Sequence, residues 1–263
     1  MQDITITIVQ SDLAWEQPLK NLDNFDKKLE PLKNCQDVIV LPEMFSTAFT
    51  MDVQQFAEEM DGTVLLWMKE KAISLNSVIS GSFIFKNKEA FYNRLVWMKP
   101  DGTYNTYDKR HLFRFGNEHN FFKAGTEKII VELNGWNICP MICYDLRFPV
   151  WAKNNYNNGH FQYDVLIYIA NWPEARKLHW QTLLKARAIE NLSYVVGVNR
   201  IGGDGRGTRH SGNSMIISPR GETLCEMADH TEDVKTIMLK KSELLQYRDK
   251  FNVAPDWDEF QLI

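Results

Sequence analysis

Segments with the apolar spacing of β-strands alternate with segments of helical spacing along the whole chain, and this alternation restricts the folds open to it. Ile4, Ile6 and Ile8 recur at every second position, which is the period of a strand with one buried face. Apolar residues then recur at three- and four-residue steps in a segment that starts near Pro18, as on one face of a helix that Pro31 ends or kinks. The same criteria predict strands at 38–41, 104–107, 165–170 and 194–198, and helices at 63–73 and 179–191.

Several strands are joined by tight turns, which predicts antiparallel pairs beside the parallel ones. The expected hairpins are 78–85 with 91–98, 129–133 with 136–143 around Asn134-Gly135, and 215–217 with 223–227 around Pro219-Arg220-Gly221. Two mixed sheets packed face to face, with helices outside, accommodate this order. We see no linker, internal repeat or low-complexity segment, so we expect an α/β fold in a single domain spanning residues 1–263.

Composition excludes several classes of protein. Hydrophobic residues make up 44% of the chain, which is enough for a sizeable core, so disorder is not expected. The 30 basic and 34 acidic residues give a net charge of −4, a poor match to nucleic acid or to an anionic membrane. No apolar run approaches the length that spans a bilayer, the N-terminus does not resemble a secretory signal, and four cysteines are too few for a disulfide scaffold. We expect a cytoplasmic protein.

Three reactive side chains stand just beyond predicted buried strands. Glu43 follows the strand that Pro42 ends, Lys109 follows the aromatic strand at 104–107, and Cys143 closes the strand at 136–142. Each residue taken alone is ordinary, because a lone cysteine is usually a small buried hydrophobe and a lone charge is usually solvated. Strand ends in α/β folds are nevertheless where sites form, so the three together predict an active site.

The motifs around these residues resemble the signature blocks of the nitrilase, or carbon–nitrogen hydrolase, superfamily. The motifs are Leu41-Pro42-Glu43-Met44, Lys109-Arg110-His111-Leu112-Phe113 and Cys143-Tyr144-Asp145-Leu146-Arg147-Phe148-Pro149. Similarity extends to Asn171-Trp172-Pro173 and to the segments 185–191 and 212–221, so it covers nearly the whole chain. The resemblance implies a four-layer α-β-β-α sandwich, a Glu43–Lys109–Cys143 triad and hydrolysis of a non-peptide C–N bond through a cysteine thioester. It also implies no cofactor, and a homodimer or higher homo-oligomer.

The chemistry of amide hydrolysis explains the three residue types. A free thiol, with a pKa of about 8.5, is mostly protonated at neutral pH, so Cys143 needs a base, and Glu43 is the candidate. Glu43 must later give a proton to the departing nitrogen, a double role that calls for a raised carboxyl pKa, which Lys109 would oppose. Lys109 would supply charge to the oxyanion, where one well-placed donor contributes roughly 2.7–4 kcal/mol.

Four residues near the triad receive supporting roles. Glu118 matches the position of a second glutamate found in many members of the superfamily, and buried beside Lys109 it would help to keep the ammonium charged. A solvated loop charge is the equally plain alternative for Glu118. The resemblance suggests the backbone N–H of Tyr144 as a second oxyanion donor. Asp145 and Arg147 are interpreted as an ion pair that holds the turn after Cys143.

The segments 109–115, 171–176 and 199–205 and the tail segments 247–251 and 256–260 are similar to the omega-amidase branch. That branch removes ammonia from the amides of 2-oxo dicarboxylic acids such as 2-oxoglutaramate and 2-oxosuccinamate. Aromatic residues flanking the triad are candidates for the pocket wall, although core packing is the commoner role: Phe45, Phe113, Tyr144 and Trp172. The carboxylate of such a substrate needs a cationic partner, and Arg114 and Arg176 stand beside the motifs. Both arginines could equally be surface charges.

Other signals do not point to a site. The glycine-rich segment 202–207 lacks the spacing of a phosphate-binding loop and is expected to be a flexible surface loop. The six histidines show no metal-ligand spacing, so no metal site is predicted. Two alternatives remain open: another activity of the superfamily, such as nitrile or N-carbamoyl amine hydrolysis, and a catalytically silent binding or scaffold member. The tail from about residue 247 could pack on a partner subunit or on its own chain through its apolar residues Phe251, Trp257, Phe260, Leu262 and Ile263.

Overall fold

Two six-stranded sheets form the centre of the molecule. The computed structural model describes residues 2–32 and 36–260. The first sheet has the order β16-β1-β2-β3-β4-β5, with β16 (Asp233–Leu239), β1 (Ile4–Gln10), β2 (Val38–Val40), β3 (Val78–Asn87), β4 (Ala90–Met98) and β5 (Tyr104–Asp108). The second has the order β15-β14-β11-β10-β7-β6, with β15 (Thr223–Glu226), β14 (Met215–Ile217), β11 (Tyr194–Asn199), β10 (Val165–Ala170), β7 (Trp136–Ile142) and β6 (Val131–Leu133).

Each sheet has three parallel strands at its centre and antiparallel strands at both sides. In the first sheet β1, β2 and β3 run parallel, and β16 and β4 pair with them in the opposite direction. In the second sheet β7, β10 and β11 run parallel, between antiparallel β6 and β14. Crossover helices join the parallel strands and tight turns join the antiparallel ones. The sequence prediction of two mixed sheets is therefore confirmed.

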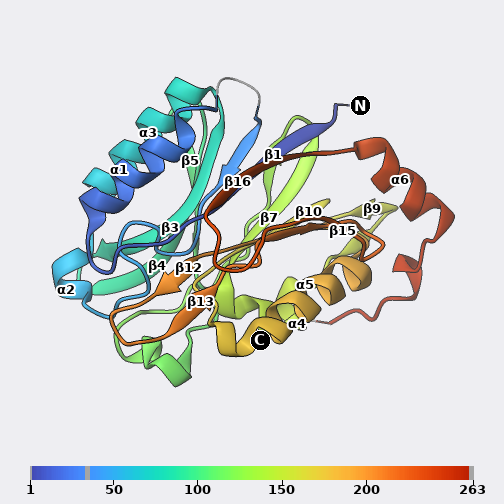
Figure 1. Ribbon diagram of the computed structural model, residues 1–263. Helices are drawn as coiled ribbons and strands as arrows, with labels where there is room; N and C mark the ends of the chain where they lie inside the picture. Colours follow the sequence, from blue (N-terminus) through green and yellow to red (C-terminus); the bar gives the residue numbers. More distant parts are fainter. Residues whose placement is uncertain (1, 33–35, 261–263) are drawn as a thin grey trace.

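Helices cover the outer face of each sheet. Figure 1 shows α1 (Pro18–Leu29) and α3 (Thr63–Leu75) on one side and α4 (Pro149–Ala152) and α5 (Lys177–Asn191) on the other. The remaining elements are α2 (Val53–Phe56), α6 (Lys241–Lys250), the short pairs β8 (Tyr156–Asn157) with β9 (His160–Phe161) and β12 (Ile201–Gly203) with β13 (Arg209–Ser211), and the 3-10 turns η1 (Arg114–Gly116), η2 (Glu118–Asn120), η3 (Cys143–Arg147), η4 (Glu174–Arg176) and η5 (Ala254–Asp256). This layering is the α-β-β-α sandwich that the sequence predicted.

Strand β2 shows how alternation divides the core. Val38 and Val40 point to the inner face and join the apolar layer between the two sheets. Ile39 points the other way and packs with Phe25 of α1 and Met68 of α3. Because successive side chains of a strand alternate between faces, a strand buried on both faces must be apolar throughout.

Most predicted elements agree with the structure, and the exceptions are polar or glycine-rich. Asn134 and Gly135 both have positive φ, 51° and 78°, as the hairpin turn predicted there requires. The glycine-rich segment, predicted to be a flexible surface loop, instead belongs to the β12–β13 hairpin, in which Ile201 pairs with Ser211. The edge strand β16 and helix α6 were not predicted, because β16 has one fully buried side chain, Leu239, and the exposed residues of α6 are polar.

Part of the tail that follows α6 packs on its own chain. Trp257 packs edge-on against the Phe161 ring at 5.8 Å, and the Lys153 ammonium lies 3.5 Å from the Trp257 ring centroid. This part of the tail therefore follows the alternative in which it packs on its own subunit. Phe251 and Phe260 are about half exposed, and the predicted contacts of Leu262 and Ile263 lie outside the described residues.

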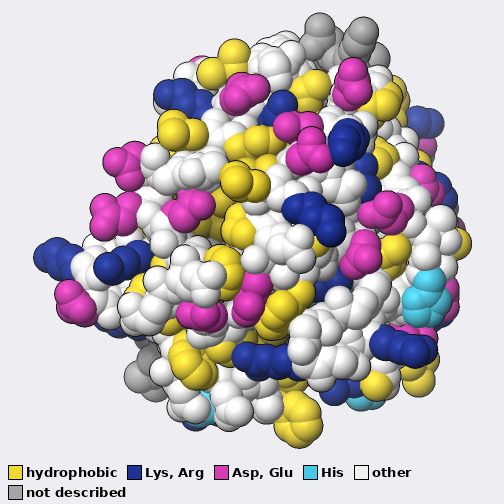
Figure 2. Space-filling view, turned by 60° about the vertical axis from the view of Figure 1, so that its left-hand side comes forward, with side chains coloured by type: hydrophobic (Ala, Val, Ile, Leu, Met, Phe, Trp, Pro, Cys, Tyr) yellow, Lys and Arg dark blue, Asp and Glu magenta, His cyan; other side chains and the backbone are white. Residues whose placement is uncertain are grey.

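The visible surface is mixed in charge. Figure 2 shows basic and acidic side chains interspersed over the face in view, without a continuous basic patch on it. Among residues 2–32 and 36–260, no helix combines the length and apolarity needed to cross a membrane. Within the same residues no three His, Cys, Asp or Glu side chains are grouped so that they could hold a metal ion.

Candidate active site

The three predicted catalytic side chains meet at one end of the two sheets. Glu43 follows β2, Lys109 follows β5, and Cys143 follows β7, so each stands past the carboxyl end of a strand. Cys143 begins the turn η3 with a φ of 44°, a left-handed conformation that costs a non-glycine residue energy. The sharp turn ends β7 abruptly at Cys143, and all three side chains line one cavity.

Lys109 lies between two carboxylates. Its Nζ donates to Glu43 Oε1 at 2.8 Å and to Glu118 at 3.0 Å, and all three side chains are completely buried. Burial alone would lower the pKa of Lys109, but the charges of Glu118 and Glu43 outweigh it and raise the pKa. Lys109 is therefore a permanent cation. The alternative of a solvated loop charge for Glu118 does not hold, because the structure buries it.

The second carboxylate connects the cluster to the cavity wall. Glu118 Oε2 accepts the backbone N–H of Phe113 at 2.5 Å, so the residue that holds the ammonium also holds the loop carrying Phe113. Burial raises the pKa of Glu118, and Lys109 partly opposes this while the nearby Glu43 adds to it. The cluster therefore places two carboxyl groups around a single ammonium.

Cys143 is a protonated thiol at rest. Burial raises its pKa well above the ordinary value, the negative charge of Glu43 raises it further, and Lys109 only partly compensates. Deprotonation therefore needs a base in contact with the sulfur, and the side chain of Glu43 is that neighbour. The arrangement can transfer a proton between sulfur and carboxylate without help from solvent.

Two asparagines that sequence reasoning missed hold Glu43. Asn93 Nδ2 donates to Glu43 Oε1 at 2.8 Å, and the backbone N–H of Asn171 donates to Glu43 Oε2 at 2.8 Å. The Asn171 side chain also donates to the backbone carbonyl of Glu43 at 2.5 Å. Asn171 belongs to a motif noted in the sequence, whereas Asn93 lies inside β4, where no motif marks it.

Asp145 holds the turn, but without the predicted ion pair. It accepts hydrogen bonds from the Tyr107 hydroxyl at 2.7 Å, from the Ile142 backbone N–H at 3.1 Å, and from the backbone N–H and ring Nδ1 of His111 at 3.0 and 2.8 Å. These donors occupy the carboxylate, which is why Arg147 does not reach it. Asp145 thereby ties the loop after Lys109 to the turn that carries Cys143.

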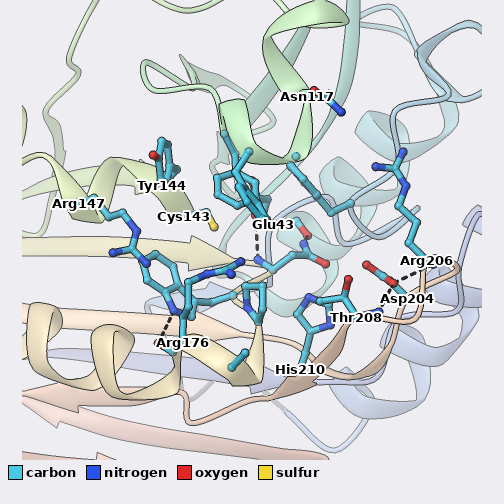
Figure 3. Close-up of a pocket in the computed structure, with 18 of the residues that line it drawn as sticks. Glu43, Asn117, Cys143, Tyr144, Arg147, Arg176, Asp204, Arg206, Thr208 and His210 are labelled. Carbon is cyan, nitrogen blue, oxygen red and sulfur yellow. Dashed lines mark hydrogen bonds between the residues drawn. The ribbon is translucent and has the colours of Figure 1, made fainter.

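The cavity has a volume of about 360 Å³ and contains unpaired arginines. Figure 3 shows Cys143 and Glu43 near its centre, with Arg147 and Arg176 on one side and Arg206 on the other. Within residues 2–32 and 36–260, no carboxylate pairs with any of these guanidinium groups. Burial lowers the pKa of Arg147, and the neighbouring charge of Arg176 lowers it further. Two like charges side by side can attract an anion to this wall.

Aromatic rings hold the two arginines in place. The Arg147 guanidinium lies 4.7 Å from the Trp172 ring centroid, and its Nη2 is 3.2 Å from His179 Nδ1. The Arg176 guanidinium lies 5.5 Å from the Phe113 ring centroid. Stacking on rings fixes a guanidinium while leaving its N–H groups free. Arg147 was not among the predicted substrate-binding residues because the sequence assigned it to the turn.

The other predicted wall residues divide into two groups. Phe113, Tyr144, Trp172 and Arg176 line the cavity, in agreement with the prediction. Phe45 does not: the positive φ of the preceding residue turns its ring into the core under α1 and α3. Arg114 does not either, because the turn η1 directs its side chain to solvent while its neighbours face the cavity. The role of the Tyr144 backbone N–H stays a prediction.

The glycine-rich hairpin supplies wall residues that the sequence did not reveal. Asp204, Arg206, Thr208 and His210 line the side of the cavity opposite η3, and Asp204 Oδ1 accepts the backbone N–H groups of Arg206 and Thr208. Burial lowers the pKa of His210 to about 4, and the charge of Arg200 contributes. His210 is thus a neutral imidazole at physiological pH.

Comparison with known proteins agrees with this geometry. The family model described as carbon-nitrogen hydrolase matches residues 5–249. Omega-amidase YafV of Escherichia coli K12 is 44% identical over 262 residues, covering 100% of both chains. 2-Oxoglutaramate amidase of Bacillus subtilis is 31% identical over 255 residues, covering 96% of each chain.

Solved structures agree as well. XC1258 of Xanthomonas campestris, described as a CN-hydrolase superfamily protein with an arsenic adduct in its active site, superposes with a TM-score of 0.97 at 41% identity, covering 100% of both chains. Nit3 of Saccharomyces cerevisiae shares the fold, with a TM-score of 0.84 at 20% identity, covering 96% of this chain and 95% of its own. The chain therefore belongs to the carbon–nitrogen hydrolase (nitrilase) superfamily, in its omega-amidase branch.

Proposed function

We propose that this protein is an omega-amidase, which releases ammonia from small amides that carry a carboxylate at the other end, most of all 2-oxoglutaramate and 2-oxosuccinamate. One observation carries the proposal: a buried thiol beside a Glu43–Lys109–Glu118 cluster shares its cavity with two arginines that have no carboxylate partner among the described residues. The cluster suits attack on an amide, and the arginines suit the distal carboxylate. The full-length relatives named omega-amidase favour the same substrate class.

In the proposed acylation, Glu43 takes the thiol proton as Cys143 Sγ attacks the amide carbon. The carbonyl oxygen becomes an oxyanion, which the Lys109 ammonium and the backbone N–H of Tyr144 stabilise. Glu43 then gives its proton to the amide nitrogen, the C–N bond breaks, and ammonia leaves a thioester on the sulfur. An unprotonated amide ion would be a far poorer leaving group.

In deacylation Glu43 acts as a base a second time. It takes a proton from water, and the oxygen attacks the thioester carbon. The second tetrahedral intermediate collapses with breakage of the C–S bond, and the proton on Glu43 returns to the sulfur. The products are a dicarboxylate and free enzyme. Glu118 takes no proton in this scheme; it keeps Lys109 charged and fixes the Phe113 backbone.

We further propose that Arg147 and Arg176 together bind the substrate carboxylate. Neighbouring guanidinium groups repel each other, and an anion between them removes that cost. Arg147 and Cys143 line the same cavity, close enough for a thiolate to influence the guanidinium, which fits a short substrate spanning from sulfur to arginine.

The test is an assay of ammonia release from 2-oxoglutaramate and 2-oxosuccinamate by the wild-type protein, with a nitrile and an N-carbamoyl amine of similar size beside them. We expect both omega-amides to react, and Cys143→Ala to abolish the reaction while Cys225→Ala, at a thiol on the edge strand β15, keeps it. Preferred hydrolysis of the nitrile or the carbamoyl compound would replace the proposal by another activity of the superfamily. Absence of all four reactions would favour a silent binding or scaffold role.

We also propose that the chain works in the cytoplasm, as a single domain, and as a homodimer or higher homo-oligomer. Apolar side chains stand on the outer layer and at the cavity rim: Val150 is 50% exposed, Leu178 72%, Ile189 51% and Phe115 84%. The three cysteines that the structure describes are free thiols, as in a reducing compartment. Light scattering after size exclusion tests the association, and a monomeric mass contradicts it.

A further inference from the structure

Asn93 occupies a position where an asparagine is costly. It lies within strand β4, opposite Ile84 of β3, and its side chain is 1% exposed. Asparagine is depleted in strands, and a buried carboxamide destabilises a fold unless its polar atoms find partners. A structural explanation would therefore require Asn93 to be fully hydrogen-bonded within the sheet.

The donor half of the carboxamide instead faces the charged cluster. Its Nδ2 lies 2.8 Å from Glu43 Oε1 and 3.4 Å from Glu118 Oε1. The Lys109 ammonium donates to the same two oxygens, and the backbone N–H of Lys109 donates to the Asn93 carbonyl at 3.0 Å. Since both neighbours are acceptors, the orientation of the carboxamide is fixed with nitrogen toward the carboxylates.

The acceptor half has no partner. Asn93 Oδ1 is buried and has no hydrogen-bond partner among the residues that the structure describes. An unsatisfied buried acceptor destabilises a protein. The fold therefore tolerates a cost at Oδ1 in order to present Nδ2 to the two carboxylates, which a role in packing alone does not explain.

From this geometry we infer that Asn93 is a positioning residue for the reaction: it holds Glu43 Oε1, so that Oε2, which accepts only the Asn171 N–H among the described residues, can exchange the proton with Cys143. The inference rests on the proposed amidase function and adds a residue to it. A neutral donor is the required chemistry, because the cluster already contains its one ammonium. A second donor to each carboxylate stabilises the charged form without adding charge.

The groups that face Glu43 come from five elements. Lys109 lies past β5, Glu118 on η2, Cys143 on η3, and the Asn171 backbone N–H past β10, with Asn93 on β4 as the fifth. Among them only the ammonium and the two N–H donors favour the ionised carboxylate; Glu118 opposes it, and a thiolate would do the same. Loss of the Asn93 donor therefore removes one of the three groups that stabilise the carboxylate form of the base.

The experiment compares Asn93→Leu, which keeps the size and removes the donor, with wild type over pH 4–9. We expect the acid limb of kcat/KM for 2-oxosuccinamate to move up by about one to two pH units, the shift that one hydrogen bond to a charged group supports, and to recover at high pH. Asn93→Asp, which puts a third carboxylate beside one ammonium, is expected to move it at least as far. This isosteric variant also keeps the test open if the leucine variant fails to fold.

A substrate-independent measurement separates this inference from the proposed function. The rate of iodoacetamide alkylation at Cys143, located by mass spectrometry of the peptide, should show the same upward displacement in its pH midpoint. If wild type releases no ammonia from any amide, the proposed function fails while the alkylation profile still tests Asn93. If the variant profiles superimpose on wild type after scaling, in either assay, Asn93 is structural and the inference is wrong.

Asn154→Leu is the matched control. Asn154 is equally buried and lies away from the cluster. Among the described residues its carboxamide hydrogen-bonds only to the backbone of Tyr163 and Asn191. Its loss should lower the melting temperature and leave both pH midpoints in place. A displacement of the midpoints in this control as large as in Asn93→Leu would show that general loosening causes the effect, and would overturn the inference.

Discussion

Replacing Arg176 by Met tests the proposed carboxylate site directly. The thioether can keep the contact with the Phe113 ring while the charge and the N–H donors are removed. A hydrogen bond to a charged group contributes about 1.5–3 kcal/mol, which at 1.4 kcal/mol per tenfold corresponds to a loss of roughly 10- to 100-fold in kcat/KM. Arg147→Met should cost a similar amount, because the two guanidinium groups face the same space.

The assay uses two substrates of the same shape. Succinamate carries the carboxylate, and succinamide carries a neutral carboxamide in its place. We expect Arg176→Met to lose the full factor with succinamate and less than threefold with succinamide. Arg114→Met is the control, since its side chain faces solvent, and it should leave both values unchanged. Equal losses on the two substrates, or no loss on either, would refute the carboxylate site.

The same pair of arginines makes a prediction about stability. Because each charge disfavours the other, Arg176→Met should not lower the melting temperature of the free protein, and an added dicarboxylate should raise that of wild type more than that of the variant. A marked drop in the melting temperature of the free variant would mean that the Arg176 side chain stabilises the fold, and would contradict this prediction.

Three further predictions concern the buried charges. Lys109→Met leaves Glu118 without its cation and should destabilise the fold by about 3–5 kcal/mol in urea unfolding. The loss should be larger at pH 8 than at pH 5, because a buried carboxyl group with a raised pKa destabilises the folded protein as the pH rises and the group ionises. An equal loss at both pH values would contradict this. Asp145→Asn removes the charged acceptor of the Ile142 backbone N–H and of the other groups that donate to Asp145, and should lower kcat at least tenfold with little change in KM. An unchanged kcat in steady-state assays would show that the turn keeps its geometry without the Asp145 carboxylate. The unfolding free energy of wild type should fall by up to about 3 kcal/mol from pH 6.5 to 4, because a histidine in the unfolded chain binds a proton over this range while His210 in the folded protein, with a pKa of about 4, does not. His210→Gln should make the unfolding free energy depend less on pH over this range. Identical slopes in the two proteins would exclude His210 as the cause.

The layers of the fold were predictable because each buried strand is apolar along its length. The strands β2 and β10 carry apolar side chains on both faces. A short apolar run bounded by prolines or loops has few interpretations other than a buried strand. The edge strand β16 escaped prediction because one of its seven side chains, Leu239, is fully buried, so it lacks the apolar run of the central strands. The β12–β13 hairpin escaped because glycines carry no side-chain pattern, although Gly202 pairs with His210 as in any ladder.

The three triad residues were predictable from their positions after strands, whereas several residues around them were not. Glu43, Lys109 and Cys143 each follow a strand, where a reactive side chain is noticeable. Asn93 has no such marker, because its function depends on which carboxylates the folded sheet brings to it. Arg147 was misassigned because the sequence shows an acid nearby but not that Tyr107, Ile142 and His111 already occupy that acid.

The left-handed backbone at Cys143 matters for anyone who wants to capture a bound substrate. Alanine at position 143 must adopt the unfavourable φ of 44°, whereas glycine adopts it freely. The difference in conformational free energy is on the order of 1 kcal/mol. Cys143→Gly should thus melt at a higher temperature than Cys143→Ala and should bind its ligand with the turn η3 less disturbed. For crystallographic trapping, the residue with the smallest side chain is the better mimic of the resting enzyme.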